Sequence, residues 1–183
     1  MRILIKTFLF SFVSVVILSC SSSHKMIDNN TVKNLDINKY IGTWYEIARY
    51  PHSFEKNLVG VTANYTLNND GTIKVINKGY KGSLSGKMKK AVGKAKIPDK
   101  RKSANLKVSF FWIFYSDYLV MELDEKDYQW AVVGSSSPNY LWILCREPQM
   151  SVMMLNEIKS RLVERGYDLS NLQMVPQHFS SSN

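Results

Sequence analysis

The side chains that could act as nucleophiles or general bases are few in this sequence and stand far apart. It has three histidines, and His24 and His178 fall in polar segments near the ends, which leaves His52 beside Pro51 as a candidate base. Nucleophilic catalysis needs such a base next to a serine or cysteine, and the sequence places no partner near His52. Residues 82–86 read Gly-Ser-Leu-Ser-Gly, with leucine where a nucleophile elbow needs serine. We interpret them as a turn and predict no catalytic residue and no enzyme activity.

Cysteine chemistry is limited to two residues. Cys145 stands in an apolar run without a second cysteine in a CxxC spacing, which predicts an inert buried thiol. Two cysteines make neither a disulfide framework nor a four-cysteine zinc site, and the sequence predicts no metal and no cofactor. A bridge between Cys20 and Cys145 is conceivable only if Cys20 carries no modification.

Cys20 ends a segment that is typical of an export signal. Arg2 and Lys6 precede an apolar stretch over residues 8–18, which is shorter than the roughly 20 residues of a transmembrane helix. We therefore predict a signal peptide over residues 1–19. Ser19-Cys20 resembles the bacterial lipoprotein box, which implies that Cys20 is diacylated and anchors the chain to a membrane. Leu18 departs from that pattern, and a cleaved signal with an unmodified cysteine stays open.

Composition and charge bound the remaining choices. The chain has 183 residues, is 45% hydrophobic and carries a net charge of +9, which is ordinary for one well-filled globular core. A cluster of eight basic residues could form a nucleic-acid-binding face on a helix, whereas a strand would spread it over about 40 Å. The cluster consists of Lys87, Lys89, Lys90, Lys94, Lys96, Lys100, Arg101 and Lys102. We favour a solvated outer face, with Lys87 and Lys89 meeting a phosphate at a rim as the alternative, and no nucleic-acid partner.

The chain divides into an anchor segment and one domain. Residues 20–35 are polar and without pattern, which predicts a flexible tether behind the lipidated cysteine. Residues 36–176 contain no break rich in proline or glycine and no repeat, so they form a single domain. Residues 177–183 are expected to be a disordered tail.

Strands dominate that domain. Residues 59–67 alternate apolar and polar side chains, which is the two-residue period of a strand with one buried face. Asn68-Asn69-Asp70-Gly71 then predicts a hairpin turn. The strands expected from such patterns are 44–50, 59–67, 72–80, 87–97, 104–110, 117–123, 128–135 and 140–146. A meander of eight strands has two edges to protect, and closure into a barrel removes both.

One helix follows the strands. Ser151 is a candidate N-cap, Leu155, Ile158 and Leu162 repeat at helical spacing, and Gly166 is placed to end it. Its single apolar stripe predicts that the helix packs on the outside of the barrel. A last short strand is expected near residues 172–175.

Three separate motifs resemble those of the lipocalins. Gly42-Thr43-Trp44 opens the first strand as the family's Gly-x-Trp does, Asp127-Tyr128 stands at the start of the seventh strand, and Arg146 ends the eighth. The stretches 46–50, 75–80, 106–111 and 140–144 are similar to the bacterial outer-membrane lipoprotein branch in particular. The similarity covers most of residues 36–175.

This resemblance implies a fold and a function. The implied fold is all-β, an eight-stranded antiparallel up-and-down barrel with one C-terminal helix outside, in which Trp44 plugs the closed end and Arg146 lies across its ring. The implied function is a lipid-binding protein of the bacterial outer membrane that stores or transfers a fatty acid or lysophospholipid. Two alternatives stay open: a structural envelope lipoprotein with a filled barrel, and a barrel enzyme acting on a lipid. Whether two copies form a homodimer also stays open.

The candidate ligand residues come from the expected mouth and interior of that barrel. The loops at the mouth contain Phe54 and the run Phe111-Trp112-Ile113-Phe114-Tyr115, which predicts a mouth that meets lipid, against aromatic rings folded down into the core. Strand alternation suggests four interior side chains. They are Tyr65, Tyr118, Val120 and Trp130.

Overall fold

The computed structural model describes residues 27–178 of the chain. The expected signal peptide and Cys20 lie outside the described residues. None of the helices in the described part is long and apolar enough to cross a membrane.

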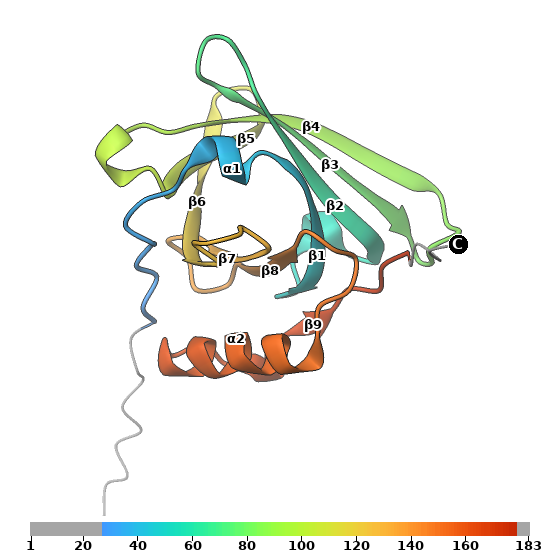
Figure 1. Ribbon diagram of the computed structural model, residues 1–183. Helices are drawn as coiled ribbons and strands as arrows, with labels where there is room; N and C mark the ends of the chain where they lie inside the picture. Colours follow the sequence, from blue (N-terminus) through green and yellow to red (C-terminus); the bar gives the residue numbers. More distant parts are fainter. Residues whose placement is uncertain (1–26, 179–183) are drawn as a thin grey trace, which may run out of the picture.

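Eight antiparallel strands close into a barrel, as predicted (Figure 1). Strand order follows the chain, and β1 closes the sheet by pairing with both β2 and β8, while the short β9 adds to the same strand. The strands are β1 Gly42–Arg49, β2 Leu58–Leu67, β3 Ile73–Lys81, β4 Met88–Lys96, β5 Asn105–Phe111, β6 Phe114–Leu123, β7 Trp130–Gly134, β8 Leu141–Cys145 and β9 Gln173–Met174.

The core has two parts, one on each side of the barrel wall. One cluster fills the barrel interior, around Trp44, Tyr65, Val75, Leu106 and Val133. The other lies between the wall and helix α2. This division follows from the two-residue period of the strands, which sends alternate side chains to opposite faces.

Helix α2 (Val152–Glu164) lies outside the barrel beneath β7 and β8, as predicted (Figure 1). Ser151 Oγ accepts a hydrogen bond from the backbone N–H of Met154 at 3.2 Å, which caps the helix. Ile158 and Leu162 are fully buried against the sheet. Gly166, with φ +89°, follows the end of the helix.

A second helix, which the sequence pattern did not reveal, crosses the closed end of the barrel. Helix α1 spans only Ile37–Tyr40 and begins at Asp36, whose side chain accepts from the N–H of Asn38. Four residues are too few to show a helical period. Three 3-10 turns complete the described elements: Ser53–Glu55, Lys100–Lys102 and Leu169–Asn171.

The described parts of both expected flexible segments pack against the barrel. Residues 27–35 run along the barrel to α1, because Arg165 donates to the carbonyls of Asp28 and Asn30 and because Leu35 is buried in the interior core. At the other end Gln177 is buried and donates to the carbonyls of Glu46 and Val61. The barrel thus orders residues that carry no periodic pattern.

Candidate functional site

The closed end of the barrel is plugged by Trp44 and Arg146. Trp44 is fully buried, and the Arg146 guanidinium lies 3.9 Å from the centre of its ring system. Gly42, at φ +99°, leaves room for this arrangement, because a Cβ there would lie 3.2 Å from Arg146 Nη1. The type and place of both side chains agree with the structural role that the family resemblance implies.

Arg146 also holds the segments that meet at this end. Its guanidinium donates to the carbonyls of Lys39, Tyr40, Ile41, Thr43 and Tyr128, at 2.6–3.2 Å. Tyr128 is buried at φ +56°, and its hydroxyl accepts the N–H of Asp36. Asp127 lies exposed in the preceding turn and is not part of this contact. Arg146 is therefore a clamp on α1 and the first strand.

Three tyrosines form a floor above the plug. The Tyr118 hydroxyl lies 2.7 Å from that of Tyr40 and 2.8 Å from that of Tyr65, so the three are hydrogen-bonded together. Burial raises the pKa of each of the three phenols. The floor is thus polar in atoms but uncharged, and Val120 lies fully buried in the same cluster.

Above the floor the inner wall changes to small side chains. Asn77 pairs with Ala63 on β2 and with Ala91 on β4, and Val75 pairs with Gly93, so these residues share the inward face of Val75. Ala91 and Ser116 are exposed although their strand register points them inward. Water therefore reaches the inner face of the barrel in its upper half.

A bulge in β1 turns a charged side chain into the barrel. The register of β1 against β8 shifts between Glu46 and Ala48, and Ile47 and Ala48 both pack toward α2. Arg49 then pairs with Trp142, on the inner face with Glu46. Bulges commonly redirect a side chain in this way.

These residues belong to a buried polar cluster under the β1–β2 loop, consisting of Glu46, Arg49, His52, Glu55 and Trp142. Arg49 Nη1 lies 2.5 Å from Glu46 Oε1, and its Nη2 donates to the carbonyls of Glu55 and Leu58. Trp142 Nε1 donates to Glu55 Oε2 at 3.2 Å. A surface pocket of about 370 Å³ lies beside this cluster. Sequence patterns do not reveal the cluster, because its members are scattered over two strands and a loop.

Two buried carboxyls lie near one guanidinium in this cluster, and only that of Glu46 contacts it directly. Burial and the neighbouring Glu55 together raise the pKa of Glu46 to about 8, against the opposing effect of Arg49. Burial likewise raises the pKa of Glu55. The pair therefore holds a proton at neutral pH, which removes one buried negative charge.

His52 is a neutral member of the cluster. Its Nε2 lies 3.1 Å from Glu55 Oε2, but neither ring nitrogen makes a well-oriented hydrogen bond. Burial and the nearby Arg49 lower its pKa to about 4. The ring stacks on Phe54 at a centroid distance of 4.0 Å. His52 has no serine or cysteine partner here, and within residues 27–178 no three side chains are grouped as metal ligands.

Aromatic side chains stand out from the mouth. Phe54 is exposed on the β1–β2 loop, and Phe111, Trp112, Ile113 and Phe114 are exposed at the tip of the β5–β6 hairpin. The alternative that these rings fold down into the core is therefore wrong. Tyr115 differs, since its ring lies beneath Lys94 and Lys96.

Trp130 does not line the interior, contrary to the strand-alternation prediction. It packs in the cluster between wall and helix, with the Arg161 guanidinium 5.7 Å from its ring centre. The left-handed backbone of Tyr128 breaks the alternation before β7 begins, and Ala131 and Val133 face inward instead.

The basic stretch is split between two faces of β4. Lys89 shares the inward face with Ala91, whereas Lys90, Lys94 and Lys96 lie on the outer face. It therefore forms no single patch. Cys145 is buried, and burial raises the pKa of its thiol, in agreement with an inert residue. Residues 82–86 form a turn closed by the hydrogen bond from Gly86 N–H to the Ser83 carbonyl.

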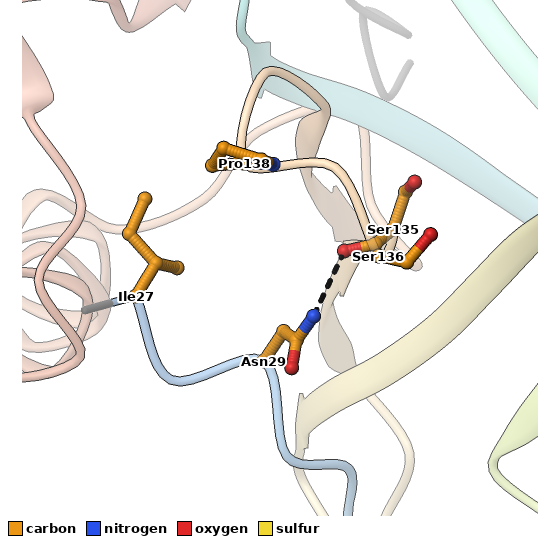
Figure 2. Close-up of a pocket in the computed structure, with 5 residues that line it drawn as sticks. All are labelled: Ile27, Asn29, Ser135, Ser136 and Pro138. Atoms are coloured by element: carbon orange, nitrogen blue, oxygen red, sulfur yellow. Dashed lines mark hydrogen bonds between the residues drawn. The ribbon is translucent and has the colours of Figure 1, made fainter.

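A smaller pocket lies where the N-terminal segment meets the β7–β8 loop. Figure 2 shows its lining, in which Asn29 Nδ2 donates to the Ser135 carbonyl at 3.4 Å. It measures about 200 Å³ and also contacts Ile27 and Pro138. It contains no ionisable side chain. Ile27 lines it together with residues of the β7–β8 loop.

A closed eight-stranded barrel with a plugged base, an inner face open to water above it and one outer helix defines a class of barrels whose interior suits one small ligand. A family model described as a lipocalin-like domain matches residues 35–177. The chain therefore belongs to the lipocalin family.

Relatives by sequence include bacterial and plant proteins. The outer membrane lipoprotein Blc of Vibrio cholerae is 42% identical over 146 residues, which cover 80% of this chain and 85% of that protein. The outer membrane lipoprotein Blc of Escherichia coli is 41% identical over 162 residues, covering 88% and 90%. Temperature-induced lipocalin-1 of Arabidopsis thaliana is 40% identical over 154 residues, covering 80% and 81%.

Solved structures share the fold. Insecticyanin from the tobacco hornworm Manduca sexta matches with a TM-score of 0.65 at 20% identity, over 86% of this chain and 87% of that chain. A major cockroach allergen matches with a TM-score of 0.64 at 23% identity, over 85% and 96%. At these identities the likeness extends to the barrel fold alone.

Proposed function

We propose that this protein is an outer-membrane lipocalin that holds one fatty acid or lysophospholipid in its barrel and stores or transfers it. The observation that carries the proposal is the inner face above the tyrosine floor, where the side chains of Ala63 and Ala91 are single methyl groups. Ala91 and Ser116 are exposed on this inner face, which favours an open cup over a barrel filled by its own side chains.

Burial of an acyl chain supplies the driving force. Each methylene removed from water contributes about 0.8 kcal/mol, and ordering the chain and extracting it from a bilayer reduce the net gain. The headgroup would lie toward the mouth, where the polar cluster and Lys89 offer hydrogen-bonding and charged groups. No bond is made or broken, so transfer is by partition.

The membrane location rests on Cys20 and on the relatives. We infer that Cys20 carries the lipid anchor and becomes the first residue of the mature chain. The naming of two relatives as outer membrane lipoproteins supports this assignment.

Reloading tests the function. The purified chain is stripped of lipid, checked for a native fold by circular dichroism, and mixed with a fatty acid or with a lysophospholipid in separate samples. Native mass spectrometry then counts bound molecules. We expect one bound lipid per chain, and the sample with the higher occupancy identifies the preferred headgroup. A folded chain that retains neither lipid would refute the proposal.

A further inference from the structure

The tip of the β5–β6 hairpin exposes four large apolar side chains in succession. Phe111, Trp112, Ile113 and Phe114, here called the aromatic tip, are 77%, 90%, 78% and 76% exposed. Phe111 pairs with Phe114, so the other two form a two-residue turn, in which Trp112 takes φ +50°. A contiguous apolar surface of this kind is typical of a contact site.

The hairpin carries this tip away from the barrel wall. The last pair between β6 and β7 joins Leu119 to Gly134, and β6 continues for five residues beyond it to Phe114. At about 3.3 Å per residue this adds roughly 16 Å along the strand. Buried Ser109 donates to the Trp112 carbonyl at 3.3 Å, which supports the turn from below. The tip is therefore a braced wedge that projects past β7, while β4 continues on its other side from Lys94 to Met88.

Cations stand directly behind the wedge. Lys94 and Lys96 lie over the Tyr115 ring, with their ammonium groups 5.8 and 4.5 Å from its centre. Such charges suit anionic headgroups, each basic side chain near such a surface contributing about 1 kcal/mol. Two copies of this protein meeting tip to tip would instead bring these lysines together. The charge pattern favours a lipid surface over a second copy.

The start of the described chain lies at the same end of the barrel. Ile27 lines the same pocket as Ser136 and Pro138 of the β7–β8 loop, which is a mouth loop like the β5–β6 turn. Ile27 stands seven positions after Cys20. The chain between them spans at most about 25 Å when fully extended. A lipid anchor at Cys20 would therefore hold the mouth, and not the plugged base, within reach of the membrane.

We propose that the aromatic tip inserts into the surface of an anionic bilayer and docks the mouth of the barrel against it. Trp112 and Ile113 enter first, and Lys94 and Lys96 stay at the headgroup level. Docking lets a lipid pass between bilayer and barrel without crossing water. This docking does not depend on which lipid the barrel accepts.

Vesicle binding of the full chain tests this inference. Cys20→Ser removes acylation, and the protein is mixed with phosphatidylcholine vesicles that contain or lack phosphatidylglycerol, some with brominated acyl chains. We expect flotation with the anionic vesicles, a blue shift of tryptophan emission and quenching by bromine. Of the four tryptophans, Trp112 alone is highly exposed, so it should carry the quenching. Trp112→Phe should keep flotation and lose most of the quenching.

Matched variants decide whether the tip is responsible. Trp112→Ser combined with Ile113→Ser should weaken vesicle partitioning at least about tenfold. Val152→Ser combined with Met153→Ser removes two side chains that are 74% and 82% exposed at the start of α2, and should change it less than twofold. Equal partitioning of the tip variant and the parent would overturn the inference. If the tip substitutions change only the sedimentation of the lipid-free protein, the inference is also overturned. The aromatic tip would then be a contact between two copies of this chain.

The lipid-loading assay keeps this test separate from the proposed function. A tip variant that loads lipid from detergent solution but does not float supports docking as a distinct property. A parent chain that floats and is quenched, yet retains no lipid, would refute the cargo and leave docking standing.

Discussion

At the scale of single residues, Arg146 is the side chain whose removal should cost most at the closed end. Arg146→Met loses the contact with Trp44 and leaves up to five carbonyls without their charged donor. We expect a loss of about 2–4 kcal/mol in the free energy of unfolding. Urea denaturation measures it. Arg101→Met, at a side chain that is almost fully exposed, is the control and should change stability by less than about 0.5 kcal/mol.

Glu46 should make stability depend on pH. Its folded pKa of about 8 lies above the value of about 4.5 expected when unfolded, so the unfolded chain releases this proton first. The resulting stability is fully present below pH 4.5 and is lost as pH rises toward 8. Glu46→Gln should therefore flatten the decline in thermal midpoint between pH 5 and pH 8. An unchanged slope in the variant would show that Glu46 is ionised throughout.

The motif residues were predictable, and the polar cluster was not. Trp44 and Arg146 follow from a motif that fixes type and position together. Glu46, Arg49, His52 and Glu55 meet only because a bulge rotates β1 by one residue and a loop returns over it. A lone sequence shows neither the bulge nor the fold of the loop.

At the scale of elements, α2 should depend on its buried stripe. Leu162 is fully buried against the barrel, so Leu162→Ala should cost about 2–5 kcal/mol through lost contacts and a cavity. Val163, the next residue, is more than half exposed, and Val163→Ala should stay within about 0.5 kcal/mol. Thermal unfolding of both variants measures the difference. Similar midpoints would mean that the helix contributes little to the folded barrel.

Alternation locates the strands in the sequence, but it does not always show which of their side chains face the barrel interior. Residues 130–133 are apolar without interruption and buried on both sides, so alternation gives no inward side. Parity along residues 128–135 predicts Trp130 inward, but the left-handed backbone of Tyr128 breaks that parity and Trp130 packs against α2. The segment at 27–35 was missed because it is held by Arg165 and by isolated apolar contacts, which have no period.

At the scale of the whole molecule, lipid loading should depend on the size of the side chains that face inward in the open upper half of the barrel. Ala91 faces inward and is exposed, so Ala91→Trp should fold normally and reduce lipid loading at least about tenfold. Val92, its neighbour on the strand, faces outward and is also exposed. Val92→Trp should load lipid as the parent does. Equal loading by the two variants would place the lipid outside the barrel.

The central claim is that an acyl chain lies inside this barrel above the tyrosine floor. Nuclear Overhauser contacts between a fatty acid with a carbon-13-labelled chain and the assigned protein test it most directly. We predict contacts from the chain to the methyl groups of Ala63 and Ala91 and to the rings of Tyr65 and Tyr118. Contacts confined to outer side chains such as Met88 and Val92, with none to these four, would contradict the account.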